Sequence, residues 1–277
     1  MELQFWKMNG AGNDFVVIDN RQKAYALTPM QISRLCDRHR GVGADGLLAV
    51  EPAQQGADYR MRYYNADGGE AEMCGNGARC FGRFANFLNG FSLGKVSFET
   101  PAGHIGATFH GDHVQIQMSE PSGLEQDLQL HAAGEPLEVH FINTGVPHAV
   151  VFVGDIAEVP VREWGAALRY HEHFAPRGTN ANFVHRIGTS HIAIRTYERG
   201  VEDETLACGT GTVACAILHH LRTGHPAPIS VDVKSGDTLE INFTRDGDTF
   251  KNVTLNGPAE FVFQGTLQLQ PSGSPDP

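Results

Sequence analysis

The sequence predicts an α+β fold made of two homologous halves, each a sheet of short strands with two helices. The main reason is an internal repeat. Four segments recur in the same order at a shift of 133 or 134 positions: residues 9–18 at 143–152, 62–65 at 195–198, 73–77 at 207–211 and 96–99 at 229–232. A duplication explains this nearly constant shift better than chance does. The second reason is that both copies carry the same run of strand and helix patterns.

Strands are predicted where apolar and polar residues alternate, at residues 15–19, 59–64, 95–100 and 113–118 of the first half. The first helix is predicted to open at Thr28 and to end before Gly41. Its counterpart in the second half covers residues 161–171. The inward residues are Ile32, Leu35 and Cys36 in the first helix and Trp164 and Leu168 in its counterpart.

A second helix follows each copy of a Cys-Gly-x-Gly motif, at residues 74–77 and 208–211. In the first half, one apolar face runs along this helix until Gly90 ends it. In the second half, residues 213–221 are apolar on most sides and Gly224 ends the helix. A helix of that kind has to be buried, and we expect it to lie inside a curved sheet.

We expect the halves to meet near residues 120–126, where Pro121, Ser122 and Gly123 break the strand pattern. The predicted division has three parts. An N-terminal half at residues 1–120 carries Cys74 and is joined by a C-terminal strand at 262–270. A C-terminal half at residues 121–261 carries Cys208, and residues 271–277 form a disordered tail.

The composition excludes several classes of protein. With 32 acidic and 21 basic side chains the formal net charge is −11, which argues against nucleic acid or an anionic membrane as a partner. There is no apolar run long enough to cross a bilayer, and the N-terminus lacks the pattern of a signal peptide. We therefore expect a cytoplasmic protein whose five cysteines are thiols. Because no pair forms CxxC, we expect no structural zinc site.

The repeated Cys-Gly-x-Gly motif suggests a chemistry. A cysteine just before a helix lies beside unpaired N–H groups and the positive end of the helix dipole, which lower the pKa of a thiol from about 8.5. The glycines leave the backbone open to an anion such as a carboxylate. If two such helix ends faced each other, Cys74 and Cys208 would flank one carbon. One thiolate would then remove a proton and the opposite thiol would return one.

An α-hydrogen of an amino acid is a far weaker acid than a thiol. A protein without a cofactor therefore has to stabilise the carbanion electrostatically, in a dry site with N–H groups aimed at the developing charge. Retaining the α-ammonium group helps, and Glu198 is a candidate acceptor for it.

The chain resembles the diaminopimelate epimerases from Met8 to about Pro258. The segments that carry the resemblance are residues 8–15, 65–68, 73–79, 143–145, 147–148, 197–200 and 207–211. The resemblance implies interconversion of LL- and meso-diaminopimelate by two cysteines, with no pyridoxal phosphate, other cofactor or metal. It implies two pseudo-symmetric domains, each a barrel-like mixed sheet around a central helix, that close over the substrate. It also implies a homodimer and a place in lysine and cell-wall precursor synthesis.

Position by position, the resemblance makes Cys74 and Cys208 the two catalytic residues. It makes the following residues substrate-binding: Asn13, Asn65, Gly75, Asn76, His148, Asn180, Glu198, Arg199, Gly209 and Thr210. Arg199 would take the distal carboxylate as a guanidinium fork. The chain departs from some members of the family at two positions. It has Val146 where they have an asparagine and Gly46 where they have a glutamine, so two contacts to the distal end of the substrate are in question.

Structural roles compete with these assignments. Cys36, Cys80 and Cys215 are interpreted as buried structural cysteines. Asn13 and Asn65 lie in glycine-rich turns, where asparagine is common for backbone reasons alone. His148 could equally be a satisfied core residue, and Glu198 with Arg199 could be a solvated pair.

Other functions compete with the epimerase, and particular residues argue for or against each of them. Residues 209–214 match a dinucleotide-binding fingerprint, but the segment before them, 197–207, is charged where that fingerprint needs a buried strand. A proline or hydroxyproline racemase uses the same chemistry but typically has histidine where Asn76 stands here. A phenazine-biosynthesis-type isomerase lacks the cysteine pair. A non-catalytic amino-acid-binding protein on the same scaffold is the alternative from another class.

Overall fold

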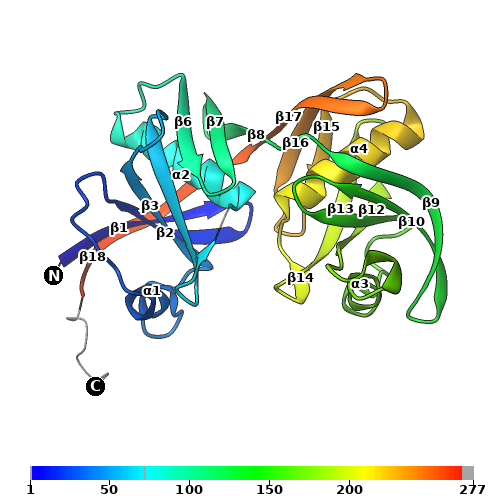
Figure 1. Cartoon of the computed structure of the whole chain (residues 1–277), viewed down its shortest axis with the longest axis horizontal. Helices are drawn as coiled ribbons and strands as arrows, with labels where there is room; N and C mark the ends of the chain where they lie inside the picture. Colours follow the sequence, from blue (N-terminus) through cyan, green and yellow to red (C-terminus); the bar gives the residue numbers. More distant parts are fainter. Residues whose placement is uncertain (1, 72, 270–277) are drawn as a thin grey trace. The chain divides into compact units, whose positions relative to one another are not determined.

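The strands of the computed structural model repeat one pairing scheme twice (Figure 1). The structure describes residues 2–71 and 73–269, so the tail predicted at 271–277 lies outside the described residues. Contacts divide the chain into two compact units. Unit 1 comprises Met1–Ile116 with Pro258–Pro277, and unit 2 comprises Gln117–Gly257.

Unit 1 is a mixed sheet in the order β18-β1-β2-β3-β4-β6-β7-β8, with the short β5 on β4. Neighbours are antiparallel except for the parallel pairs β2–β3 and β4–β6. The strands are β1 (Glu2–Gly10), β2 (Asn13–Asp19), β3 (Gly46–Pro52), β4 (Tyr59–Asn65), β5 (Glu70–Ala71), β6 (Lys95–Thr100), β7 (Gly103–His110), β8 (His113–Gln117) and β18 (Glu260–Gln268).

Unit 2 has the same order, β9-β10-β11-β12-β13-β15-β16-β17, with β14 on β13. The parallel pairs are again the equivalent ones, β11–β12 and β13–β15. The strands are β9 (Ser122–Ala132), β10 (Glu135–Asn143), β11 (Pro147–Phe152), β12 (Asn180–Arg186), β13 (His191–Glu198), β14 (Asp203–Thr205), β15 (Ile229–Asp232), β16 (Thr238–Asp246) and β17 (Thr249–Pro258). The predicted α+β fold with two homologous halves is confirmed.

The strand register corrects the repeat by one residue near its start. The shift of 134 aligns Asp14 with His148, but β2 and β11 align differently. Phe15 pairs with Gly46, and His148 pairs with Asn180 in the equivalent parallel pair. Phe15 is therefore the counterpart of His148. A shift of one residue matters because it moves a side chain to the other face of the sheet.

Each unit wraps its sheet around one central helix. Helix α2 (Gly75–Leu88) contacts β1, β2, β3, β4, β6 and β7, and α4 (Gly209–Thr223) contacts the six equivalent strands of unit 2. The aromatic rings of Phe81 and Phe98 lie 4.6 Å apart, and those of Phe84 and Trp6 lie 4.9 Å apart. Gly224 ends α4 in the left-handed conformation, at φ 72°. The predicted burial of both helices is confirmed.

The other two helices cover the outer faces of the sheets. Helix α1 (Pro29–Cys36) begins with a capping box on Thr28 and packs Ile32, Leu35 and Cys36 on the sheet of unit 1. Helix α3 (Val161–Arg169) packs Leu168 on the sheet of unit 2. It ends two residues before the predicted limit and is followed by a short 3-10 turn, η1 (Glu172–Phe174). Strands covered on both faces need apolar residues at consecutive positions, as the buried run from Phe15 to Ile18 shows.

The segment at residues 120–126, where we expect the strand pattern to break and the two halves to meet, is mostly a strand in the structure. Strand β9 begins at Ser122, so most of this segment is paired with β10. Gly123 has φ 64° within the strand, which explains why its residues resemble a turn. The contacts separate the units at Ile116 and Gln117 instead.

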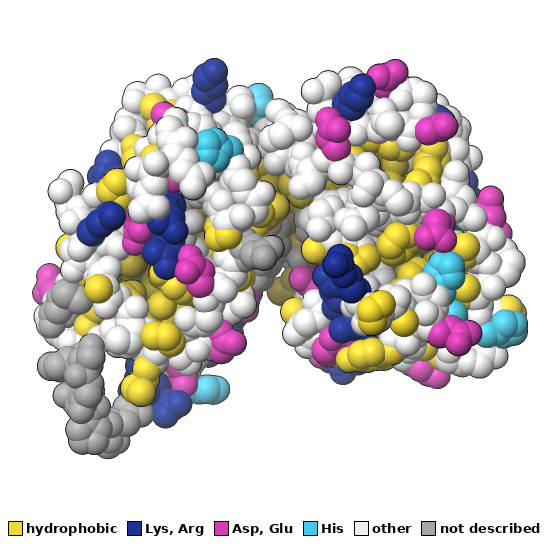
Figure 2. All heavy atoms as spheres, in the orientation of Figure 1, with side chains coloured by type: hydrophobic (Ala, Val, Ile, Leu, Met, Phe, Trp, Pro, Cys, Tyr) yellow, Lys and Arg dark blue, Asp and Glu magenta, His cyan; other side chains and the backbone are white. Residues whose placement is uncertain are grey.

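Two features of the described residues concern membrane and nucleic-acid partners: the length of the helices and the distribution of surface charge. No helix among the described residues is long and apolar enough to cross a membrane. On the face shown in Figure 2, basic and acidic side chains are interspersed rather than gathered into one basic patch.

Candidate active site

Both repeated cysteines are helix N-caps. Cys74 precedes α2 with φ −138° and ψ 125°, and Cys208 precedes α4 with φ −125° and ψ 107°. Their carbonyl oxygens accept the first helical bonds, from the N–H of Ala78 at 2.7 Å and of Thr212 at 2.9 Å. Neither side chain caps its own helix. The motif therefore builds, in each unit, a thiol beside a helix N-terminus suited to an anion.

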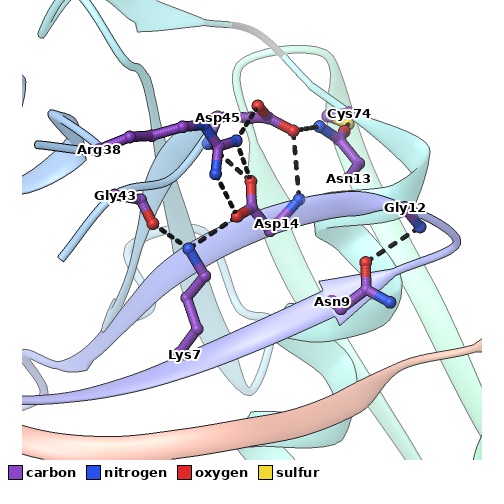
Figure 3. Close-up of polar contacts among 9 residues, drawn as sticks. All are labelled: Lys7, Asn9, Gly12, Asn13, Asp14, Arg38, Gly43, Asp45 and Cys74. Atoms are coloured by element: carbon purple, nitrogen blue, oxygen red, sulfur yellow. Dashed lines mark hydrogen bonds and ion pairs between the residues drawn. The ribbon is translucent and has the colours of Figure 1, made fainter. Parts of the chain in front are cut away.

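Asn13 faces the thiol of Cys74 in unit 1. The Cys74 Sγ–H donates to Asn13 Oδ1 at 3.4 Å, and Asn13 Nδ2 donates to Asp45 Oδ2 (Figure 3). Asp45 is held in turn by the guanidinium of Arg38 at 2.8 Å. Because a carboxylate only accepts hydrogen bonds, Asp45 fixes the orientation of the Asn13 amide, with its oxygen towards the sulfur.

A charge cluster around the buried Lys7 anchors this arrangement. Lys7 is 6% exposed and pairs with Asp14 at 2.7 Å, while Arg38 makes two bonds to the same carboxylate at 2.8 and 2.9 Å (Figure 3). Burial alone would raise the pKa of Asp14, but the hydrogen bonds and charges of Arg38 and Lys7 outweigh it and hold the pKa well below its usual range. The cluster joins β1, β2 and the segment that precedes β3.

In unit 2 a buried polar group stands behind Cys208. The Thr210 hydroxyl lies 3.6 Å from Cys208 Sγ and 2.9 Å from His148 Nε2. His148 is fully buried, and Asn182 Nδ2 lies 3.1 Å from its Nδ1. Burial, together with the charge of Arg199, lowers the pKa of His148 to about 3. The imidazole is therefore neutral at physiological pH.

The remaining predicted residues of unit 2 lie at the ends of β12 and β13. Asn180 donates to the carbonyl oxygen of Pro147 at 2.9 Å and accepts from the backbone N–H of Arg199 at 2.8 Å. Burial raises the pKa of the neighbouring Glu198, and the nearby Thr205 hydroxyl opposes that shift. Because burial removes water from this carboxyl, its charged form is stabilised when a cationic ligand binds next to it.

In unit 1 the position equivalent to Glu198 is Asn65, at the end of β4. Asn65 is exposed, and its backbone closes a turn with Gly68 and Gly69. Gly46 pairs with it across the sheet. A Cβ at Gly46 would lie 2.5 Å from the carbonyl oxygen of Tyr64, so this backbone has no room for a larger side chain.

The other three cysteines are structural, as predicted. Cys36, Cys80 and Cys215 are buried, free thiols. Burial raises the pKa of Cys36 and of Cys80 to about 12 and that of Cys215 well above its usual value. Such thiols do not ionise near neutral pH.

Six residues around the cysteines were not predicted from the sequence. They are Lys7, Asp14, Arg38, Asp45, Asn182 and Thr196. The signal available for Asn182 was its place in an apolar strand segment, where a polar residue needs a buried partner. The charged residues gave no such signal, because Arg38 and Asp45 lie in a segment that reads as a solvated loop.

Comparisons with known proteins identify the family of this chain. The family profile described as Diaminopimelate epimerase matches residues 5–124 and 140–262, one segment for each half. A diaminopimelate epimerase of Aquifex aeolicus is 44% identical over 277 residues, covering 96% of this chain and 98% of the relative. One from Chlorobaculum tepidum is 42% identical over 266 residues, covering 95% and 100%.

Solved structures share the fold at low identity. A phenazine biosynthesis protein of the PhzF family from Bacillus anthracis has a TM-score of 0.74 and 15% identity, covering 97% of this chain and 100% of that one. A probable proline racemase from Agrobacterium radiobacter has a TM-score of 0.70 and 16% identity, covering 98% and 94%. Since the profile spans both halves and the relatives match at nearly full length, this chain belongs to the diaminopimelate epimerase family.

Proposed function

We propose that the protein inverts one α-carbon of 2,6-diaminopimelate, interconverting the LL and meso forms without pyridoxal phosphate. The observation that carries the proposal is a cysteine at the N-cap of the central helix in both copies of the repeat. Family membership supplies the substrate, because relatives 40–44% identical over nearly the whole chain are named diaminopimelate epimerase.

The proposed chemistry uses the two thiols as acid and base. The thiolate of one cysteine takes the α-proton, so that an S–H bond forms as the C–H bond breaks and the electron pair stays on the substrate. The thiol of the other cysteine then delivers its proton to the opposite face of the carbon and becomes the thiolate. Charge and protons balance. The thiolate now lies on the other cysteine, a form set for the reverse reaction, and proton exchange with solvent restores the first form.

The first turns of α2 and α4 would hold the reacting carboxylate. The backbone N–H groups of Gly75, Asn76, Gly209 and Thr210 lie in these turns. Such groups stabilise the charge that moves onto the carboxylate as the proton leaves.

The other polar groups of the substrate would be bound by side chains near the strand ends. We assign the α-ammonium to Glu198, whose partly buried carboxyl suits a cation, and the distal carboxylate to Arg199. Asn13, Asn65 and Asn180 would complete the binding of the distal end. His148 is fully buried, so its role is to act through Thr210 rather than to touch the substrate.

We further propose that the protein works in the cytoplasm as a homodimer. Five free cysteines support a reducing compartment, and the dimer is supported by family membership.

The test is NMR of LL-diaminopimelate in D2O with reduced protein and no added pyridoxal phosphate, with L-proline in a parallel sample. Deuterium at one α-carbon of diaminopimelate, together with meso product and unchanged proline, is the expected result. Exchange in proline alone would move the protein to the racemases that share its fold. Silence in both samples would leave a non-catalytic amino-acid-binding protein.

A further inference from the structure

The two copies of the repeat differ in what lies behind the catalytic helix. In unit 1, a Cβ at Gly77 would lie 3.4 Å from the Phe15 ring and 3.5 Å from Leu48. In unit 2, a Cβ at the equivalent Gly211 would lie 3.3 Å from the His148 ring and 2.5 Å from Asn182 Oδ1. The duplication has therefore kept the packing positions and replaced an apolar pair with a polar one.

The strand register extends the difference to a third position. Leu48 pairs with Tyr63 across β3 and β4, and Asn182 pairs with Thr196 across β12 and β13. Thr196 is 3% exposed and Asn182 is fully buried. The Thr196 hydroxyl donates to Asn182 Oδ1 at 3.0 Å. Three positions that hold aromatic or aliphatic side chains in unit 1 (Phe15, Leu48 and Tyr63) thus hold buried, hydrogen-bonded polar side chains in unit 2.

From Thr196 to Thr210, the partners of each side chain determine which atom donates each hydrogen bond. Asn182 Oδ1 accepts from Thr196, so Nδ2 is the donor to both the carbonyl oxygen of Ala149, at 3.0 Å, and His148 Nδ1, at 3.1 Å. His148 Nδ1 must then carry a lone pair. Since the imidazole is neutral, its proton is on Nε2 and is donated to Thr210 Oγ1 at 2.9 Å.

The last step reaches the sulfur. Thr210 Oγ1 accepts from His148, which leaves its own proton to be donated elsewhere. Cys208 Sγ lies 3.6 Å from this hydroxyl, a contact in which either atom can donate, and the Thr210 proton is available to point towards it. A hydroxyl that donates to a sulfur favours the thiolate over the thiol.

We infer that Asn182, supported by Thr196, is a positioning residue that fixes the tautomer of His148 and so directs the Thr210 hydroxyl to donate to Cys208. The inference rests on the proposed two-thiol function, which it deepens. In unit 1 the equivalent positions, Leu48 and Tyr63, lack an amide and cannot impose a direction of this kind on Cys74.

Other titratable groups lie around the α4 N-terminus. Glu198 stands at the end of β13, Lys234 follows β15 and lines the same small hollow as Cys208, and Cys215 lies on α4 itself. Lys234 is paired with Glu204 at 2.6 Å. The substitutions chosen below leave all of these groups in place, so a change in the behaviour of Cys208 reports on the series alone.

The first experiment measures the alkylation rate of Cys208 by iodoacetamide against pH, in a Cys74→Ser background and with the modified peptide identified by mass spectrometry. Asn182→Leu and Thr210→Val are each expected to move the pH profile of alkylation about one pH unit towards alkaline pH. Near neutral pH this shift lowers the alkylation rate about tenfold. The double variant is expected to be no slower than either single one. Thr210→Ser should restore the original profile, and Leu48→Met, the matched control in unit 1, should leave it unchanged.

The second experiment reads the tautomer directly by NMR of protein labelled with ¹⁵N-histidine, with the His148 signals assigned from His148→Gln. The expected result is a proton on Nε2 and none on Nδ1 across the neutral range, with that preference lost in Asn182→Leu. A proton on Nδ1 in the unmodified protein would overturn the inference. So would an unchanged alkylation profile in Asn182→Leu, or shifts that add in the double variant. Neither readout needs turnover, so both are independent of the substrate assignment.

Discussion

The two cysteines proposed as catalysts occupy the same position in the repeat but face groups of opposite polarity. Cys74 donates its S–H to the amide oxygen of Asn13, whereas Cys208 lies beside a hydroxyl that accepts from His148 and keeps its own proton to donate. An acceptor stabilises a thiol and a donor stabilises a thiolate. We therefore expect Cys208 to hold the negative charge in the resting protein and Cys74 to hold the proton.

Replacing either cysteine tests the assignment at the scale of one residue. Cys74→Ser and Cys208→Ser are each expected to lower the rate of epimerisation by more than about a thousandfold, because an alcohol is too weak an acid to replace a thiol in proton transfer at neutral pH. The rate is measured by deuterium incorporation into diaminopimelate. Cys36→Ala, which changes a buried cysteine of α1, is the matched control and should retain turnover. Near-normal turnover in either serine variant would sink the two-thiol assignment.

His148 should make stability depend on pH. Its pKa is lowered to about 3 in the folded protein by burial and by Arg199, against about 6.5 in an unfolded chain. Between these pH values the unfolded state binds one more proton than the folded state. The free energy of unfolding therefore falls as the pH drops below about 6.5, and the equilibrium constant for unfolding rises by at most about tenfold per pH unit. Urea unfolding of the protein and of His148→Gln at several pH values measures this. The variant should show a flatter dependence between pH 6 and pH 4, and equal slopes would contradict a lowered pKa for His148.

At the scale of elements, the helices and most strands could be predicted because their patterns are local. The capping box at Thr28 and the left-handed Gly224 mark helix ends through chemistry that is visible in the sequence. The start of β9 could not be predicted, since Pro121 and Gly123 read as a turn although pairing with β10 overrides them. The end of α3 was placed too late for a related reason. The 3-10 turn that follows continues a helical pattern through Phe174, whose burial depends on tertiary packing.

The first turn of α4 is packed more tightly than that of α2, which provides a matched pair of substitutions. Gly211→Ala would place a Cβ 2.5 Å from Asn182 Oδ1, whereas the closest contact in Gly77→Ala is 3.4 Å. We expect Gly211→Ala to lose activity and about 1–3 kcal/mol of stability through overpacking. Gly77→Ala should be neutral in stability or gain up to about 1 kcal/mol from helix propensity. Urea unfolding gives both values. Equal losses in the two variants would show that the polar packing behind α4 is not special.

The charge cluster that joins β1, β2 and the end of the α1 segment should limit stability in acid. Since the pKa of Asp14 is lowered in the folded protein, its contribution is complete above about pH 4 and is lost as the pH falls further. Asp14→Asn leaves Lys7 buried without its carboxylate partner and is expected to cost about 3 kcal/mol at neutral pH. Thermal unfolding against pH checks both statements, with Asp19→Asn on the more exposed ion pair of Arg21 as control. A similar small cost for both variants would remove the special status of the cluster.

At the scale of the whole molecule, one topology serves twice, with a difference in how it is completed. Strand β9 pairs with β10 from within unit 2, but the equivalent partner of β1 is β18, at the other end of the chain. The repeat in the sequence predicted the shared fold and the paired cysteines, because duplicated motifs keep their spacing. It did not predict Asn182 or Thr196, since these residues matter only through a strand register that aligns them with Leu48 and Tyr63.

In the proposed function the two halves act on one carbon, which requires Cys74 and Cys208 to approach each other when a substrate is bound. We predict that oxidation in air joins them in an inactivating disulfide, because thiols that flank a single carbon come within reach of the bond geometry during closure. The other three cysteines are buried with raised pKa values and should not compete. Peptide mapping without reductant should find the crosslink between the segments that contain residues 74 and 208, and dithiothreitol should restore activity. Full activity after prolonged oxidation, with both thiols still titratable, would count against the two halves closing on a shared substrate.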